Sequence, residues 1–231
     1  MKNKDIYYVV GTDTGVGKTV LCLLLMQFFD HSSPFYIKPF QTGCTDVYAP
    51  DSDALFIYRH VKGLETRDPA QSVIFCFKNP KAPFFAARDE GKAVDMEVVL
   101  DVIHKKARLY SPVIVEAAGG LLVPVTEDIL VVDTVKMIGA RPVVVARAGL
   151  GTINHTLLSL EAMDRRGIVP AGIVFFDLGD PPTPKDMLLE NMEAVEKYSG
   201  VKVTGVVGRI DNFISPEKDC YKPIEKLVSL S

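Results

Sequence analysis

The chain has 231 residues, a formal net charge of -3 and a composition that is 48% hydrophobic and 24% charged. These values are typical of a soluble globular protein and exclude a disordered or collagen-like chain. The sequence contains no basic patch and no long run of like charge, so we expect no nucleic-acid partner. The length, without an internal repeat or a break in composition, predicts one domain over residues 1–231.

In chain order, the hydrophobic pattern predicts a strand at 6–10, a helix at 18–29, a strand at 35–37, helices at 52–60 and 95–110, a strand at 113–115, a helix at 129–138, a strand at 143–146, a helix at 154–166, a strand at 172–176, a helix at 185–198 and a strand at 203–207. The proline-containing stretches 62–92 and 177–184 are predicted to be loops. This alternation predicts an α/β fold, with a mostly parallel sheet flanked by helices on both faces.

No segment of the sequence resembles a membrane span or an export signal. The apolar runs fall far short of the roughly 20 residues that cross a bilayer. The run from Ile6 to Val10 is short for a signal peptide and is followed by a polar glycine loop without a small-residue cleavage site. We therefore expect a cytoplasmic protein with no membrane contact. Free thiols in that reducing compartment are expected for the four scattered cysteines, Cys22, Cys44, Cys76 and Cys220.

The strongest chemical motif is GTDTGVGKT, which runs from Gly11 to Thr19 between the first predicted strand and the first predicted helix. Gly15 and Gly17 let backbone N–H groups turn toward phosphates, Lys18 reaches the β and γ phosphates, and Thr19 offers a hydroxyl to Mg²⁺. The first glycine lies one residue earlier than in the strict G-x-x-x-x-G-K-[ST] spacing, so the loop is longer by one. An incidental glycine turn is disfavoured because strand, glycines, Lys-Thr and helix occur in order. The motif predicts a nucleoside triphosphate site in a P-loop type of α/β fold.

Two acids and a second lysine are candidates for the same site. Glu116 follows a buried apolar run, where a carboxylate is unfavourable unless it is paired, so we favour a functional role. Asp53 lies in the first turn of a predicted helix, where a magnesium ligand and a plain N-terminal acid are equally good interpretations. Lys38 follows the second predicted strand and is expected to face the crevice, although a surface lysine at a strand exit remains the alternative.

A glycine-flanked turn at 149–152 precedes the helix predicted from Asn154. The free backbone N–H groups at the start of this helix could hold a carboxylate or a phosphate. For His155, a packing or capping role is favoured over a catalytic one.

Six segments together resemble the dethiobiotin synthetase family over about residues 6–166: GTDTGVGKT at Gly11, IKPFQTG at Ile37, DSDAL at Asp51, KAPFFAA at Lys81, IVEAAGGLLVPV at Ile114 and GLGTINHTLL at Gly149. The resemblance implies an ATP- and Mg²⁺-dependent ligase of biotin biosynthesis. Its reaction joins CO2 to 7,8-diaminononanoate and gives dethiobiotin, ADP and phosphate through a carbamate and a carbamic-phosphoric anhydride.

The resemblance also implies residue roles by matching position. Nucleotide contacts are implied for Asp13, Thr14, Gly15, Val16, Gly17, Lys18, Thr19, Val20, Asp53, Glu116, Ala117, Ala118, Gly119, Phe176 and Asp177. Magnesium contacts are implied for Thr19, Asp53 and Glu116, and substrate contacts for Thr12, Lys38, Thr42, Gly151, Thr152 and Asn154. Lys18 and Lys38 are implied as catalytic residues. A homodimer is implied as well, with the substrate carboxylate held by the start of the helix near Gly151 in the second subunit.

The sequence departs from the family pattern at three places. Ala117 replaces a glycine, Phe176 replaces the asparagine that reads the nucleobase, and the segment from Gly208 to Asp211 replaces a Gly-x-Ile-Pro loop. A phenylalanine side chain offers stacking alone, whereas an asparagine amide both donates and accepts hydrogen bonds. We therefore predict relaxed selectivity for ATP, with Asp177 or Asp211 as the remaining candidate acceptor.

Three other functions share parts of this pattern. A MinD-like switch ATPase would carry a lysine early in the loop, where this chain has Thr12, Asp13 and Thr14, and would end in a membrane-binding amphipathic segment. A cobyrinate-type amide ligase would bring a glutaminase domain, for which we expect no room. A non-catalytic nucleotide-binding module would show no hydrolysis stimulated by substrate.

Overall fold

A computed structural model describes residues 6–230. Its centre is a seven-stranded sheet in the order β3-β2-β4-β1-β5-β6-β7, and all neighbouring strands run parallel. The strands are β1 (Ile6–Gly11), β2 (Phe35–Thr42), β3 (Val73–Phe77), β4 (Val113–Gly120), β5 (Arg141–Arg147), β6 (Gly172–Phe176) and β7 (Val203–Val207). The predicted parallel α/β fold is confirmed.

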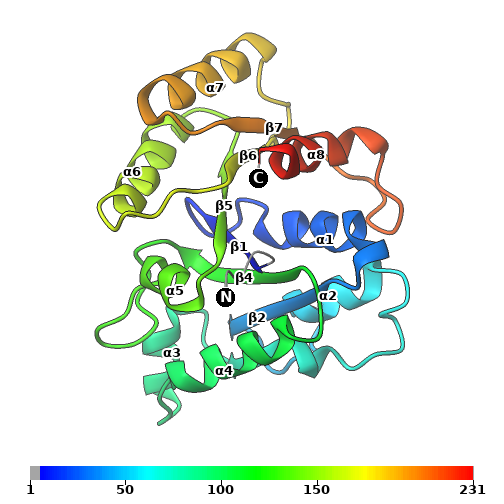
Figure 1. Cartoon of the computed structure of the whole chain (residues 1–231), viewed down its shortest axis with the longest axis vertical. Coiled ribbons are helices and arrows are strands. Elements are labelled where there is room, and N and C mark those ends of the chain that lie inside the picture. Colours follow the sequence, from blue (N-terminus) through cyan, green and yellow to red (C-terminus); the bar gives the residue numbers. More distant parts are fainter. Residues whose placement is uncertain (1–5, 231) are drawn as a thin grey trace.

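Helices cover both faces of this sheet (Figure 1). The helices are α1 (Lys18–Phe28), α2 (Asp53–His60), α3 (Pro83–Asp89), α4 (Met96–Ala107), α5 (Val131–Ile138), α6 (Thr152–Asp164), α7 (Lys185–Ser199) and α8 (Lys222–Ser229). One large hydrophobic core lies between the sheet and α4, α5, α6 and α7, a second lies between the sheet and α1, α2 and α8, and a small third cluster packs α3 on β3. None of these helices is both long enough and apolar enough to span a membrane.

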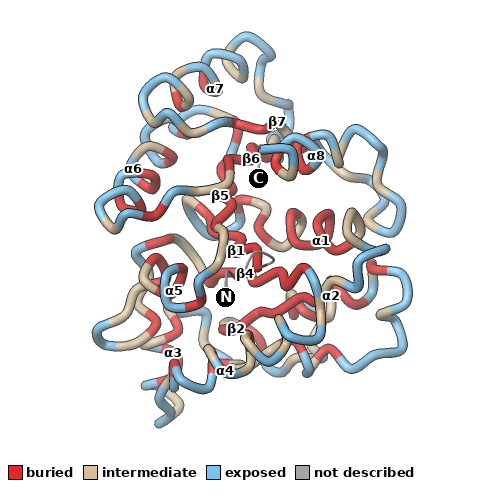
Figure 2. The backbone as a smooth tube through the Cα atoms, in the orientation of Figure 1, coloured by how far each residue is buried: buried red, intermediate tan, exposed pale blue. Residues whose placement is uncertain are grey.

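The central strand β1 shows why the sheet forms. Tyr8 and Val10 face the core under α4 to α7, whereas Tyr7 and Val9 face the core under α1. Every residue of β1 is buried, so an apolar side chain is favoured on both faces of the strand. Figure 2 shows the result, a buried sheet surrounded by helices whose outer surfaces are exposed. The carboxyl end of β1 leads directly into the glycine loop.

All six predicted strands and all six predicted helices are present, but one strand and two α-helices were not predicted. The stretch 62–92, predicted to be a loop, contains β3 and α3. β3 is short and only partly buried along most of its length because it pairs with β2 alone at the edge of the sheet. The third element is α8, whose apolar residues Ile224 and Leu227 are fully buried against the sheet. The other predicted loop, 177–184, contains no helix or strand.

Two strands extend further than predicted. β2 continues through Pro39 to Thr42, so Lys38 lies inside the strand and not after it. The proline is tolerated because the ladder between β2 and β4 ends at Ile37, and Pro39 lacks only a backbone donor. Likewise, β4 continues to Gly120, so Glu116 lies inside a strand, where ionic partners compensate its burial.

Candidate active site

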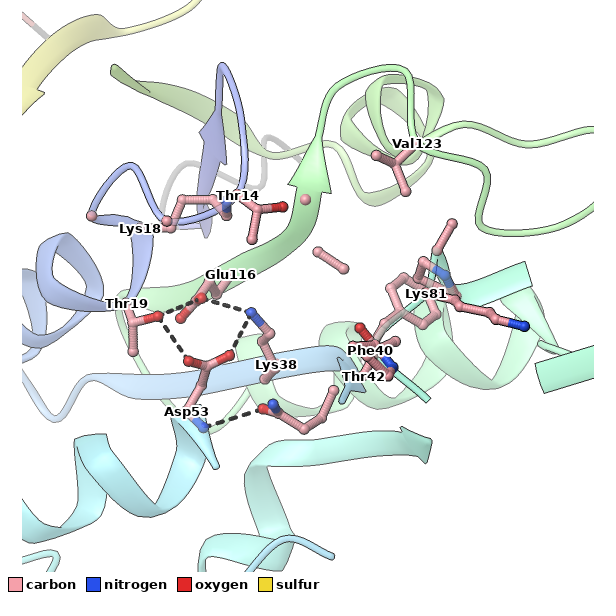
Figure 3. Close-up of a pocket in the computed structure, with 18 of the residues that line it drawn as sticks. Thr14, Lys18, Thr19, Lys38, Phe40, Thr42, Asp53, Lys81, Glu116 and Val123 are labelled. Carbon is pink, nitrogen blue, oxygen red and sulfur yellow. Dashed lines mark hydrogen bonds and ion pairs between the residues drawn. The ribbon is translucent and has the colours of Figure 1, made fainter. Parts of the chain in front are cut away.

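A cavity of about 590 Å³ opens at the carboxyl ends of β1, β2 and β4. Its walls are the glycine loop with the start of α1, the end of β2, the start of α2, the end of β4, and the segment from Pro80 to Pro83 (Figure 3). In an open parallel sheet, ligands bind in the crevice beyond the carboxyl ends of the strands. This cavity therefore lies where the fold places ligands.

The glycine loop is held in a shape that permits phosphate binding. Gly15 and Gly17 have φ angles of 68° and 105°, which side chains rarely adopt. Gly17 is the N-cap of α1, so the free N–H groups of the first turn of this helix lie beside the loop. Across the loop, the ammonium of Lys18 donates to the carbonyl oxygen of Asp13 at 2.7 Å. The loop of the motif thus closes around its own lysine.

Three oxygen-bearing side chains converge behind this loop. The hydroxyl of Thr19 lies 2.9 Å from a carboxylate oxygen of Asp53 and 2.9 Å from Oε1 of Glu116. The three come from α1, α2 and β4, which are far apart in the sequence (Figure 3). A hydroxyl and two carboxylates are the oxygen ligands that Mg²⁺ prefers. Residues 6–230 contain no cluster of three or more His, Cys, Asp or Glu side chains that could bind a metal.

Lys38 joins this cluster as a buried cation. Its Nζ lies 2.6 Å from Oε1 of Glu116 and 2.8 Å from Oδ2 of Asp53. The side chain of Lys38 is 7% exposed and that of Glu116 is 1% exposed. Gln41 and Tyr36, which also lie on β2, bind the same two acids: Gln41 accepts the backbone N–H of Asp53 at 3.3 Å, and Tyr36 donates to Glu116 at 2.7 Å.

The two lysines differ in how firmly they hold a proton. Burial and then the ammonium of Lys38 lower the pKa of Lys18 to about 8. Burial opposes the charge of Lys38 too, but the carboxylates of Glu116 and Asp53 outweigh it and raise the pKa of Lys38 above its ordinary value. Burial also disfavours an ionised Asp53, yet Lys38 holds the pKa of this acid below its usual range. Lys38 therefore stays protonated at neutral pH. Lys18 has a lowered pKa, and a nearby anion would favour its protonated form.

The expected substrate residues do not all lie at this cavity. Thr42 lines it at the end of β2. Gly151, Thr152 and Asn154 lie at the start of α6 and do not line it. Thr12 lines a different cavity of about 410 Å³, between the glycine loop and α6. One chain alone thus does not bring the start of α6 to the cluster around Lys38.

Relatives of known name match most of the chain. A family model described as an AAA domain matches residues 5–217. The ATP-dependent dethiobiotin synthetase BioD of Bacillus subtilis strain 168 is 36% identical over 212 residues, which cover 89% of this chain and 88% of the relative. The protein of the same name from Anaeromyxobacter dehalogenans strain 2CP-C is 40% identical over 183 residues, which cover 77% of this chain and 80% of the relative. The chain belongs to the dethiobiotin synthetase family. The family predicted from the sequence is confirmed.

More distant solved structures resemble the chain in fold alone. A ParA family ATPase from Chlorobium tepidum superposes with a TM-score of 0.53 at 15% identity and covers 98% of this chain and 90% of its own. An ATP complex of McdA from Cyanothece superposes with a TM-score of 0.56 at 11% identity, and the match covers 100% of this chain and 97% of the McdA chain. Dethiobiotin synthetases and partition ATPases thus share an architecture, and the family assignment rests on the sequence relatives.

The base-reading position of the dethiobiotin synthetase family has a different environment in this chain. Phe176 is 1% exposed, and a Cβ built on Gly17 would lie 2.6 Å from its ring. The ring also lines a cavity of about 220 Å³, which shares Val20 and Leu178 with the larger cavity. The carboxylate of Asp177 already accepts hydrogen bonds from the N–H and hydroxyl of Thr183, at 2.9 to 3.2 Å.

Two further departures from the dethiobiotin synthetase pattern can be placed. Asp211 is highly exposed, pairs with Arg209 and does not line the smaller cavity. Ala117 lies within β4, and Ser33 is the sole non-glycine residue of the described chain with a positive φ. Alanine therefore occupies position 117 without backbone strain.

Tyr36 and Gln41 are the site residues that sequence reasoning missed. Tyr36 lies inside the strand predicted at 35–37 but outside the six segments quoted above, and Gln41 lies in the segment IKPFQTG without an assigned role. The available signal was the period of two, since Tyr36 and Lys38 are two positions apart on one strand and their side chains point to the same face.

Proposed function

We propose that this chain catalyses the ATP-dependent ring closure that gives dethiobiotin from CO2 and 7,8-diaminononanoate. The observation that supports this most directly is the convergence of Lys18, Lys38, Thr19, Asp53 and Glu116 at one cavity beside a phosphate-binding loop. Relatives that carry the dethiobiotin synthetase name at 36% and 40% identity support the same reaction.

In the proposed reaction, one amine of the diamine attacks CO2, loses a proton and becomes a carbamate. A carbamate oxygen then attacks the γ phosphorus of ATP, and ADP leaves. The second amine attacks the carbonyl carbon of the resulting mixed anhydride, so a second C–N bond forms, phosphate leaves and the ring closes. Both reacting partners in the phosphoryl transfer are anions, so positive charge at the cavity matters more than a general base.

The residues of this chain supply that charge in separate places. Lys18 reaches from the start of α1 toward the position of the phosphates, and Lys38 reaches from β2 toward the position of the carbamate. Thr19, Asp53 and Glu116 would hold Mg²⁺, which when bound neutralises phosphate charge. The wall beyond Lys38 includes Phe40 and is mainly apolar, as an alkyl chain requires.

We further propose a cytoplasmic homodimer in which α6 of the second subunit completes the substrate site. The start of α6 lies outside the cavity of its own chain, as a contribution to the partner requires. Leu150 beside this helix is 94% exposed, and exposed Leu122 and Leu158 line the cavity between α6 and the glycine loop. Exposed apolar side chains of this kind are typical of a surface that a partner covers.

The proposed function is tested with purified protein, ATP, Mg²⁺ and bicarbonate, with and without 7,8-diaminononanoate. We expect phosphate release that depends on the diamine, together with dethiobiotin detected by mass. Phosphate release that does not depend on the diamine would contradict the proposal and favour a switch ATPase. No phosphate release at all would favour a non-catalytic nucleotide-binding module.

Relaxed nucleotide selectivity is expected from the smaller cavity. Its side chains are mainly apolar, and Phe176 cannot hydrogen-bond a base. We expect kcat/KM values for ATP, GTP and CTP that agree within about tenfold, measured at saturating diamine. A preference for ATP of about 100-fold or more would show that backbone groups or Asp180 read the base. The KM for diamine, measured with each nucleotide, serves as the control and should not change.

A further inference from the structure

Glu116 has a partner that the proposed reaction does not use. The hydroxyl of Tyr36 donates a hydrogen bond of 2.7 Å to Oε2 of Glu116, whereas Thr19 and Lys38 both bind Oε1. The side chain of Tyr36 is 1% exposed and lies in the core under α1 and α2. One carboxylate oxygen therefore faces the cavity, while the other is held from inside the protein.

The register between β2 and β4 brings the hydroxyl of Tyr36 to the carboxylate of Glu116. Tyr36 of β2 pairs with Ile114 of β4, so a step of two residues along both parallel strands leads to Lys38 and Glu116. Residues two apart on a strand share a face, and all four side chains therefore point toward α1. Tyr36 thus approaches Glu116 from the amino-terminal side of the strands, and Lys38 approaches it from the cavity side.

The hydrogen bond restricts the carboxylate. A buried carboxylate that is held at one oxygen by a fixed donor cannot rotate freely about its last side-chain bond, and its free energy would rise if it lost that donor. Metal ligands are generally oriented by such outer contacts, whose removal typically lowers metal affinity about 10- to 100-fold.

We infer that Tyr36 is a positioning residue, which orients Glu116 so that Oε1 faces the divalent metal of the nucleotide complex. This inference rests on the proposed function, because that function assigns Glu116 to the metal. Tyr36 itself does not line the cavity, and it meets the cavity wall at Glu116. Its effect passes through a single carboxylate and should therefore appear in metal affinity before it appears in substrate affinity.

The test is a titration of Mn²⁺ by electron paramagnetic resonance in the presence of a non-hydrolysable ATP analogue. We expect Tyr36→Phe to raise the Kd for Mn²⁺ about tenfold, because phenylalanine keeps the buried ring and removes only the donor. Thr19→Val is the positive control, since it removes a proposed ligand. A Kd for Tyr36→Phe within twofold of the unmodified protein would overturn the inference.

Tyr8→Phe is the matched control. Tyr8 is fully buried on β1, and its hydroxyl hydrogen-bonds to Thr134, in the core on the opposite face of the sheet. The substitution removes the same atom from an equally buried ring, so we expect an unchanged Kd for Mn²⁺. If Tyr8→Phe shifts the Kd as much as Tyr36→Phe does, general loosening of the sheet explains both and the inference is wrong.

A double variant checks that Tyr36 acts through Glu116. In a Glu116→Gln background, Tyr36→Phe should change the Kd less than twofold, whereas a full tenfold shift would show an independent effect and contradict the inference.

If Tyr36→Phe is too unstable for the titration, the thermal stabilities of the single and double variants are compared instead. The double variant should be more stable than Tyr36→Phe alone, because it removes the carboxylate left without its donor. A double variant no more stable would overturn the inference. Mn²⁺ binding requires no turnover, so a failure to form dethiobiotin would count against the proposed function alone.

Discussion

Replacing Lys38 by alanine is expected to lower kcat about 1000-fold at saturating diamine, in the range found when one charge-stabilising donor is removed from an active site. The ammonium is buried and permanently charged, and it lies 2.6 Å and 2.8 Å from the two acids proposed to hold the metal. In the proposed reaction it faces the carbamate as negative charge moves to the transferred phosphoryl group. No other described lysine lies within ion-pair distance of both acids.

The same substitution leaves Asp53 and Glu116 without their cation, and buried charge without a partner destabilises the fold. Thermal unfolding with and without Mg²⁺ and ATP separates this loss from the loss of catalysis. Lys38→Met keeps the length of the side chain and should be as inactive as Lys38→Ala. Lys105→Ala removes an exposed lysine paired with Asp101 on α4 and should leave kcat unchanged. Turnover of Lys38→Ala near the normal value at saturating diamine would disprove the carbamate role.

Replacing Lys18 by alanine should lower kcat/KM for the nucleotide about 1000-fold or more. The side chain crosses the glycine loop, and its ammonium donates to the carbonyl oxygen of Asp13. In the proposed complex, the ammonium would instead bind the β and γ phosphates, so both the KM for ATP and kcat depend on it. The measurement is steady-state kinetics over a range of nucleotide concentration, combined with direct binding of an ATP analogue.

Lys18 is also a packing residue, since it is 6% exposed and its methylene groups lie close to Gly11. Lys18→Met fills the same space and separates the loss of charge from the loss of packing. We expect Lys18→Met to resemble Lys18→Ala in kinetics while it retains more thermal stability. If the methionine variant kept normal kcat/KM, the loop backbone alone would be sufficient for phosphate binding.

Local pattern was sufficient to predict most of the fold. The six predicted strands are apolar at nearly every position because helices cover both faces of the sheet, and the glycine loop is a continuous motif between a strand and a helix. β3 escaped prediction because an edge strand of five residues between Pro69 and Pro80 carries little burial signal. α8 escaped prediction because only Pro223, Ile224 and Leu227 of its residues are buried.

The candidate site was predictable in its parts but not in its assembly. Lys38 and Glu116 were identified as candidates by their positions beside apolar runs. Their contact, however, depends on β2 lying next to β4, although one strand and three α-helices lie between them in sequence. No local sequence pattern indicates the order of the strands in the sheet. The role of Tyr36 could not be predicted for the same reason, because it arises only when β2 and β4 are placed in register.

The packing of Phe176 on Gly17 constrains how this sequence can diverge. Any side chain at position 17 would collide with the ring, and a smaller residue at position 176 would leave a hole beneath the phosphate loop, at a cost of up to about 3–5 kcal/mol. Position 17 is therefore expected to stay glycine, both because of its φ of 105° and because of the ring beside it, so divergence is expected at position 176 alone. A lineage that carries the phenylalanine could recover a base-reading side chain only through a variant with a weakened loop, so the altered base cavity is expected to persist once acquired.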